Sequence, residues 1–188
     1  MAGRAKKGSR FEREFSKRLS MWWTNGVRDD IFWRSSNSGG RATNRAKSGQ
    51  QTAGQAGDIA ATDPAGAPLL ELITFELKCG YPDAHAAMMF DRPATSKKSK
   101  WEEFLLQAVA SAKLNKSFAW MLVHKRDRKL PMIWVPGRLV DEMTEQGCPK
   151  PNICIRAKNK KCIYGTTLEA WFRDNSPDDV RDVLTSLD

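Results

Sequence analysis

Two short apolar stretches of the chain carry residues that can hold a metal ion and move a proton. Asp58 starts one stretch, and Glu76-Leu77-Lys78 ends the next. Because side chains alternate faces along a strand, Glu76 and Lys78 point to one side and Leu77 points into the core. If the two strands pair as a hairpin, Asp58 lies beside Glu76. Two adjacent carboxylates repel each other unless a divalent cation sits between them, and Mg²⁺, or Mn²⁺ in its place, suits such oxygen ligands.

The chemistry open to this group of residues is the attack of water on a phosphate. A metal held by the two carboxylates lowers the pKa of a bound water and makes hydroxide available near neutral pH. Lys78 could orient or deprotonate that water, or neutralise the charge that develops in the transition state. The alternative is structural, because a strand-end Glu-x-Lys occurs by chance in many proteins and then forms a solvated ion pair.

A helix expected at the start of the chain carries another acid, Glu12. Ser9 can cap this helix, with Glu12 three residues later completing a capping box, so Glu12 has a structural role as well as a functional one open to it. The helix has one apolar stripe at helical spacing, formed by Phe11, Phe15, Leu19 and Trp22. The basic residues 1–8 in front of it are interpreted as a flexible arm.

The hydrophobic pattern predicts alternating strands and helices. Strands are expected at 31–33, 58–62, 69–78, 118–123 and 132–135, followed by a hairpin of 153–155 against 162–164. Helices are expected around 101–112, at about 138–145 and from Ser176 onward. The 101–112 helix has Gln107 off its buried face, which is marked by Trp101, Phe104, Leu105, Ala108, Val109 and Ala112. This order indicates an α/β fold with a central mixed sheet.

Composition limits the classes of protein to which the chain can belong. Its 188 residues have a formal net charge of +9 and 40 % hydrophobic residues, which is typical of a globular chain with one core. No apolar run approaches the roughly 20 residues that cross a bilayer, so we expect no membrane partner and a cytoplasmic location. The four cysteines lack Cys-x-x-Cys pairs and are expected to be reduced thiols, with a zinc site as the alternative.

Basic segments flank an acidic middle of the chain. Residues 1–50 carry 12 basic and 4 acidic side chains and residues 97–129 carry 9 and 3, whereas residues 51–96 carry 2 and 6. This distribution favours a polyanion held by Lys and Arg around a carboxylate cluster, with ordinary solvated surface as the alternative. The charge does not distinguish DNA from RNA.

Four segments, in this order, resemble the PD-(D/E)XK nuclease superfamily and, within it, archaeal-type Holliday junction resolvases. They are Gly8-Ser9-Arg10-Phe11-Glu12-Arg13-Glu14, Arg34-Ser35-Ser36-Asn37-Ser38-Gly39, Gly57-Asp58-Ile59 and Phe75-Glu76-Leu77-Lys78. The resemblance covers residues 8–125. It implies that Glu12, Asp58 and Glu76 bind metal, with the main-chain carbonyl of Leu77, and that Lys78 is catalytic. It also implies that Ser36 or Ser38 touches the phosphate and that Gln107 belongs to the site.

The resemblance implies a restriction-endonuclease-like α/β fold, in which helices flank a central mixed β-sheet. We expect a flexible basic arm at 1–8, a nuclease core domain at 9–136 and a C-terminal α+β extension at 137–188 packed on the core. Gly57 stands where many members of the superfamily have proline. The C-terminal region has no counterpart in the minimal resolvases.

The resulting hypothesis is a Mg²⁺-dependent DNA endonuclease that hydrolyses phosphodiester bonds in branched DNA, such as a Holliday junction, and so serves DNA recombination as a homodimer. One alternative is a nuclease of the same fold that acts on linear duplex or DNA ends, as phage and restriction enzymes do. Another is a non-catalytic nucleic-acid-binding module. DNA contacts are expected from Arg34, Ser36, Ser38, Arg41, Arg45, Lys47, Lys97, Lys98 and Lys100.

Overall fold

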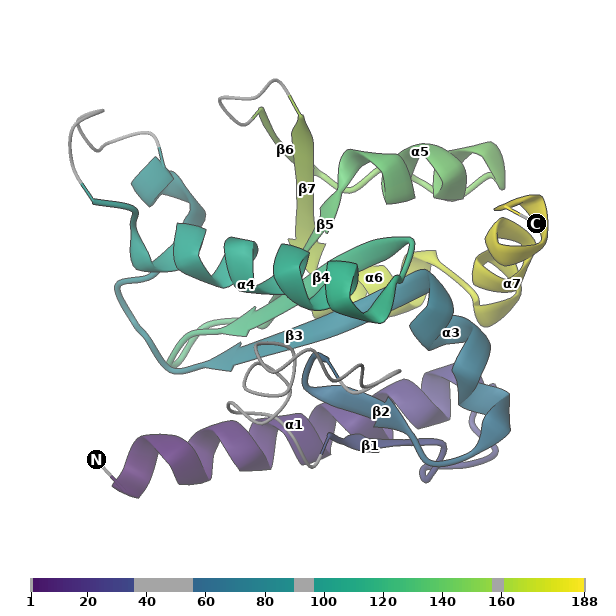
Figure 1. Cartoon of the computed structure of the whole chain (residues 1–188), viewed down its shortest axis with the longest axis horizontal. Helices are drawn as coiled ribbons and strands as arrows, with labels where there is room; N and C mark the ends of the chain where they lie inside the picture. The colour runs from purple at the N-terminus through teal and green to yellow at the C-terminus, as the bar shows by residue number, and fades with distance from the viewer. Residues whose placement is uncertain (1, 36–55, 90–96, 157–160, 188) are drawn as a thin grey trace.

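A five-stranded mixed sheet of order β3-β4-β5-β7-β6 forms the centre of the protein, shown as a computed structural model in Figure 1. The structure describes residues 2–35, 56–89, 97–156 and 161–187. The strands of this sheet are β3 (Ile73–Cys79), β4 (Ala119–Lys125), β5 (Met132–Pro136), β6 (Ile153–Arg156) and β7 (Cys162–Thr167). β3 and β4 are parallel, whereas the other neighbours are antiparallel. The predicted fold class, a central mixed sheet flanked by helices, is confirmed.

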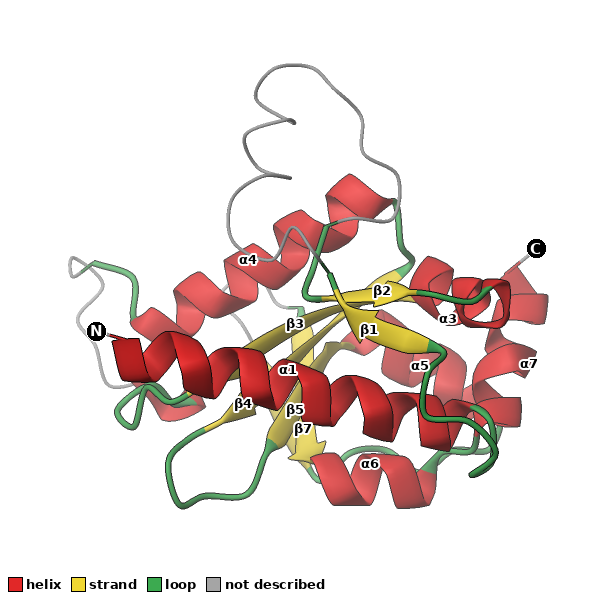
Figure 2. Cartoon of the chain, turned by 90° about the horizontal axis from the view of Figure 1, so that it is seen from below, coloured by secondary structure: helices red, strands yellow, loops and turns green. Residues whose placement is uncertain are grey.

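Helices cover both faces of this sheet. One face packs against α1 (Ala2–Trp23), α3 (Ala67–Leu72), α5 (Gly137–Glu145), α6 (Leu168–Asp174) and α7 (Pro177–Leu187), and the other packs against α4 (Lys100–Asn115). On the first face the ring centroids of Phe15 and Phe75 lie 5.7 Å apart, and on the second those of Trp101 and Trp134 lie 5.1 Å apart. Figures 1 and 2 show α1 and α4 on opposite sides of the strands.

The first helix starts earlier than the sequence pattern predicts. α1 begins at Ala2 and runs through Ser9, so the expected start at Ser9 and its capping box with Glu12 are wrong. Residues 2–7 contain Ala, Arg and Lys, which are strong helix formers, and they continue the helix toward the N-terminus. The buried stripe is formed as expected except at its end, where Trp23 is buried and Trp22 only half-buried.

The expected hairpin between residues 58–62 and 69–78 is absent from the described structure. β2 (Ile59–Ala61) pairs instead with β1 (Phe32–Arg34), in a separate antiparallel two-stranded sheet. The chain then passes through a 3-10 turn at Pro64–Gly66, capped by Asp63, and through α3 before β3 begins. The leucines at 69, 70 and 72 favour a helix, and proline is tolerated in its first turn, so the first part of the predicted strand is helical.

The C-terminal elements extend the same sheet. The predicted hairpin is formed by β6 and β7, with Cys154 opposite Tyr164, and the predicted helix near 138–145 is α5. α7 begins at Pro177 as expected, because the Ser176 hydroxyl accepts from the Asp179 N–H at 3.1 Å. α6 was not predicted.

Two further expectations concern single side chains and the cysteines. Val109, expected on the buried face of α4, is instead 45 % exposed. All four cysteines are free thiols, as expected. None of the helices in the described ranges is both long enough and apolar enough to cross a membrane.

Candidate active site

Asp58 reaches the β3 strand through main-chain contacts at the end of the small sheet. The N–H of Asp58 donates to the main-chain oxygen of Phe75 at 2.9 Å, and the N–H of Leu77 donates to Oδ2 of Asp58 at 2.7 Å. Gly57 permits this approach, because its φ is +92° and a Cβ there would lie 2.8 Å from the Phe75 oxygen. The Asp58 carboxyl is thereby fixed beside β3, close enough to the Glu76 carboxyl to affect its pKa.

Two further residues hold the segment around Asp58 in place. Ser35, which follows β1, donates its hydroxyl to the Gly57 oxygen at 2.7 Å and its N–H to the Asp58 oxygen at 2.8 Å. The amide of Asn115, at the end of α4, accepts from the N–H of Ala56 at 2.9 Å and donates back to its oxygen. The carboxylate position is therefore set from both the small sheet and α4.

Glu76 and Lys78 lie on the face of β3 that α4 covers. Their side chains form an ion pair, and Glu76 is only 1 % exposed. The Ser111 hydroxyl of α4 donates to the second oxygen of Glu76 at 3.3 Å, and the Lys78 ammonium lies 5.7 Å from the ring centroid of Phe104. Leu77, between them, is buried in the core on the opposite face.

The main chain of Leu77 also faces the open side of β3. In a strand the N–H and C=O of one residue point to the same side. The Leu77 N–H is bonded to Asp58, away from β4, so its carbonyl is directed to the Asp58 side. β3 is the edge strand of the five-stranded sheet, and this edge is therefore available to present a carbonyl oxygen beside the carboxylates.

The environment of the two carboxylates disfavours their charge. Burial and the neighbouring Asp58 carboxylate raise the pKa of Glu76 from 4.5 to about 7, against the effect of Lys78. Burial likewise raises the pKa of Asp58, while Lys78 and the Leu77 N–H act in the opposite direction. Near neutral pH, and without a further cation, the pair therefore retains a proton for part of the time.

Glu12 is the third acid at this edge of the sheet. It projects from α1 and forms an ion pair with Arg34 of β1, with Nε and Oε2 3.1 Å apart. Burial and the Asp58 charge raise the pKa of Glu12, and Arg34 and Lys78 lower it. The Glu12 Oε2 atom is buried, so its ion pair with Arg34 lies largely away from solvent. Arg34 thus lies in the site itself, as the counter-charge of Glu12.

A divalent cation fits this donor set chemically. The acids provide hard oxygen ligands whose charge exceeds that of the two nearby cations. In the parts of the chain that the structure describes, however, no three Asp, Glu, His or Cys side chains are grouped closely enough to hold an ion. In this structure the Glu12 carboxylate is instead paired with Arg34.

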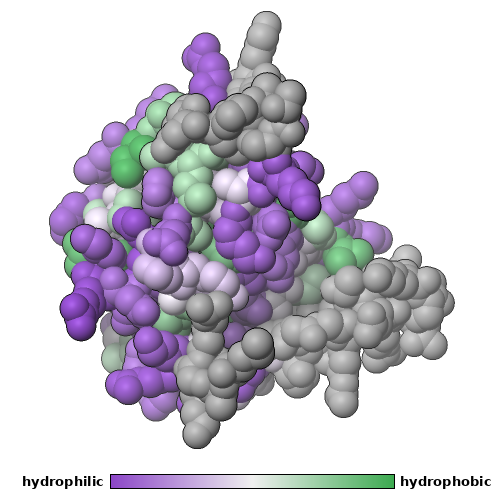
Figure 3. Space-filling model, turned by 90° about the vertical axis from the view of Figure 1, so that its left-hand side faces the viewer, coloured by the Kyte–Doolittle hydropathy of each residue, from purple (hydrophilic) through white to green (hydrophobic). Residues whose placement is uncertain are grey.

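The other predicted site residues are only partly placed. Gln107 is exposed on α4, between Phe104 and Ser111, three and four residues away, which is the spacing of one helical face. Lys97, Lys98 and Lys100 are exposed at the start of α4. Figure 3, which looks at the left-hand side of Figure 1, shows a described surface that is mainly hydrophilic with small hydrophobic areas. Five expected DNA contacts lie outside the described residues, namely Ser36, Ser38, Arg41, Arg45 and Lys47.

Sequence reasoning missed three residues that shape the site. Ser111 donates to Glu76, Phe104 lies beside Lys78, and Ser35 holds the turn before Asp58. Ser111 stands one helical turn after Gln107, so helical periodicity was the signal that could have indicated it. No local pattern indicated Ser35, because the residues that it contacts, Gly57 and Asp58, are more than 20 positions away in the chain.

An α/β sheet whose edge strand carries Glu-x-Lys, with an Asp from the preceding segment beside it, defines the PD-(D/E)XK class of nucleases. The chain belongs to the family described as "Phage putative PDDEXK endonuclease", whose model matches residues 3–182. No curated protein and no solved structure gave a significant match. The family match confirms that the chain belongs to the PD-(D/E)XK superfamily. The matched residues extend through the C-terminal elements into α7. The match gives no support for a particular closeness to Holliday junction resolvases.

Proposed function

We propose that the protein is a divalent-metal-dependent DNA endonuclease whose active centre lies at the open edge of β3. The observation that carries this proposal is the burial of Asp58 and Glu76 next to each other and next to Lys78. Burying adjacent acids disfavours folding unless they have partners, and strongly perturbed carboxylates in such a position are typical of catalytic sites. A non-catalytic binding module would have no need for this arrangement.

The proposed roles follow from the position of each residue. Asp58, Glu76 and the carbonyl of Leu77 would hold Mg²⁺, with Mn²⁺ as a substitute, and Glu12 would join them if it leaves Arg34. The bound metal supplies a polarised phosphate oxygen and an acidified water. Lys78, held by Glu76 and Phe104, orients the attacking water and balances the charge that develops on the phosphate. Arg34 and Gln107 contact the substrate beside it.

The first experiment tests the metal-dependent cleavage itself. Labelled duplex DNA is incubated with the protein in Mg²⁺, in Mn²⁺ and in excess chelator, alongside Glu76→Gln. We expect cleavage with either metal and none with chelator or with the variant. Glu103→Gln is the matched control, since Glu103 lies on the same side of the sheet but is exposed on α4. Chelator-resistant cleavage, or an active Glu76→Gln, would contradict the proposal.

For the substrate, we propose branched DNA cut by a homodimer, because a four-way junction requires two matched incisions. The family description favours a second candidate, a phage-type nuclease that acts on linear duplex or DNA ends. Cleavage rates on a four-way junction and on a linear duplex of the same sequence separate the two. Sedimentation of the protein alone and with each DNA reports the oligomeric state. If the protein is a monomer and cleaves both DNAs at the same rate, the branched-DNA proposal is wrong and the linear-duplex candidate remains.

A further inference from the structure

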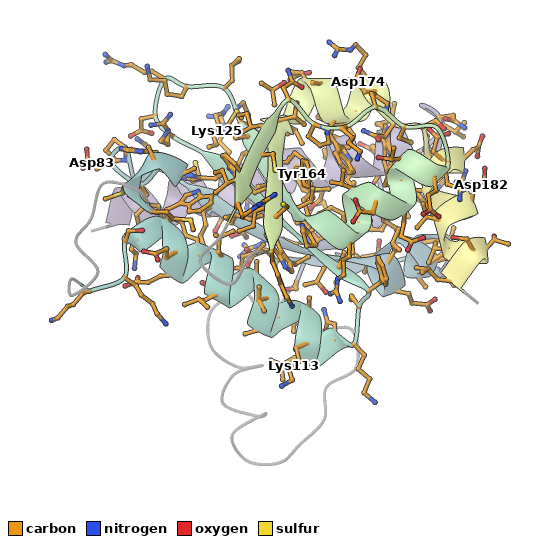
Figure 4. All side chains as sticks on the ribbon, turned by 90° about the horizontal axis from the view of Figure 1, so that it is seen from above. Asp83, Lys113, Lys125, Tyr164, Asp174 and Asp182 are labelled. Carbon is orange, nitrogen blue, oxygen red and sulfur yellow. The ribbon has the colours of Figure 1, made fainter. Side chains whose placement is uncertain are left out.

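A second concave surface lies on the flank of α4 that faces away from the carboxylates. This hollow of about 950 Å³ is bounded by the C-terminal half of α4, the start of α5 and the start of β7. Figure 4 labels two of its lining residues, Lys113 on α4 and Tyr164 on β7. Ser111, which contacts Glu76, is only two residues from Lys113, so one helix separates the two surfaces.

The rim of the hollow is strongly basic. Four cations from three parts of the chain line it, Lys113, Lys116, Arg138 and Lys161, and all four are exposed. Asp141 is the one carboxylate among its lining residues. An excess of three positive charges around a concave surface concentrates polyanions by electrostatic focusing.

The interior of the hollow is apolar and aromatic. Trp120, Tyr164, Ile163 and Val109 contribute to its lining. Val109 is 45 % exposed although it belongs to a helix that packs on the sheet, because it faces this hollow. Aromatic and aliphatic surface bounded by cations is the combination that binds single-stranded nucleic acid, since bases stack on the rings and phosphates pair with the cations.

We propose that this hollow binds an unpaired stretch of nucleic acid, a few nucleotides long. Its volume is at the upper end of the range for small-molecule pockets, which suits a short single strand and is too small for a duplex. The inference rests on the proposed nuclease function and sharpens it. A duplex at the edge of β3 would continue as an unpaired strand over the C-terminal part of α4. Among branched DNAs, the proposal therefore favours a duplex next to a single-stranded arm over a fully paired four-way junction.

The direct test is the affinity for a labelled single-stranded oligonucleotide, measured by fluorescence anisotropy in chelator. We expect Lys113→Ala/Lys116→Ala to weaken binding about tenfold and to lower the slope of log affinity against log salt by about 1.4, the value for two lost phosphate contacts on a single strand. Lys129→Ala/Lys150→Ala is the matched control, because both lysines are exposed and neither lines the hollow. Equal losses in the two double variants would overturn the proposal.

The stacking part of the proposal has its own test. Tyr164→Leu keeps an apolar side chain but removes the ring. We expect it to lower the affinity for the oligonucleotide several-fold and to leave the affinity for an abasic oligomer of the same length unchanged. Equal effects on both ligands would exclude base stacking. Metal-dependent cleavage of plain duplex by these variants should stay near the wild-type rate. Variants that lose single-strand binding but still cleave duplex DNA would separate this inference from the nuclease proposal. A wild-type protein that cleaves duplex DNA but does not bind the oligonucleotide would refute this inference and leave the nuclease proposal standing.

Discussion

The raised pKa of Glu76 makes a quantitative prediction about stability. In the folded, metal-free protein this pKa is about 7 instead of 4.5, so ionisation of Glu76 costs the folded state roughly 3 kcal/mol. Between these two pH values the folded state binds more protons than the unfolded chain, so this contribution to stability is lost as the pH rises. Glu76→Gln removes the ionisation and should therefore stabilise the protein at high pH, although it abolishes activity.

A second buried group, His124, changes the stability with pH in the opposite direction to Glu76, so the two contributions must be measured separately. Burial lowers the pKa of His124 from 6.5 to about 4, so the unfolded chain binds the additional proton in that range and stability is lost as the pH falls. In the wild-type curve alone the two effects partly cancel below pH 6.5. The difference between Glu76→Gln and wild type removes the contribution of His124, because both proteins contain it, and leaves the titration of Glu76 together with its neighbour Asp58.

The assay is urea unfolding in chelator at pH 5, 6.5 and 8. The free energy of unfolding of Glu76→Gln should exceed that of wild type by an amount that grows by roughly 2–3 kcal/mol between pH 5 and pH 8. Glu103→Gln, on the exposed surface of α4, should show no such growth. A difference that is constant with pH, or that shrinks toward pH 8, would refute the burial of an acid at this position.

Three further predictions concern single side chains. Lys78→Ala should slow single-turnover cleavage at least ~100-fold while changing duplex affinity, measured by anisotropy, only a few-fold, because its charge acts in the transition state. Arg34→Ala leaves the partly buried Glu12 without its cation and should lower the free energy of unfolding by about 1–2 kcal/mol, more at pH 8 than at pH 5, as urea titrations would show. Gly165→Ala places a Cβ 2.5–3.0 Å from three ring atoms of Trp134 and should cost about 2–3 kcal/mol in thermal unfolding, whereas an unchanged melting temperature would contradict the close packing of β7 on β5.

Local patterns in the sequence were sufficient for most of the elements. The apolar periodicity of α1 and α4, the continuous apolar run of β4 and the short apolar stretches that form β6 and β7 each depend on residues close together in the chain. The same holds for the opposite directions of Leu77 and Lys78, which follow from strand alternation alone. Misplaced features, such as the start of α1 and the helical residues 67–72, lie where helix formers adjoin residues that also suit turns or strands.

The electrostatics of the site required the tertiary structure, because they depend on contacts between segments far apart in the chain. The sequence placed Asp58 near Glu76 by assuming a hairpin, whereas the fold brings them together through Gly57 and the main chain of β3. Nothing in the local sequence pairs Glu12 with Arg34, and nothing in it buries Glu76 under Ser111 of α4. The sequence alone thus determined which residues carry the charge. How far that charge is desolvated, and which cation lies next to each acid, was decided by the packing of α1, β1 and α4 around one edge strand.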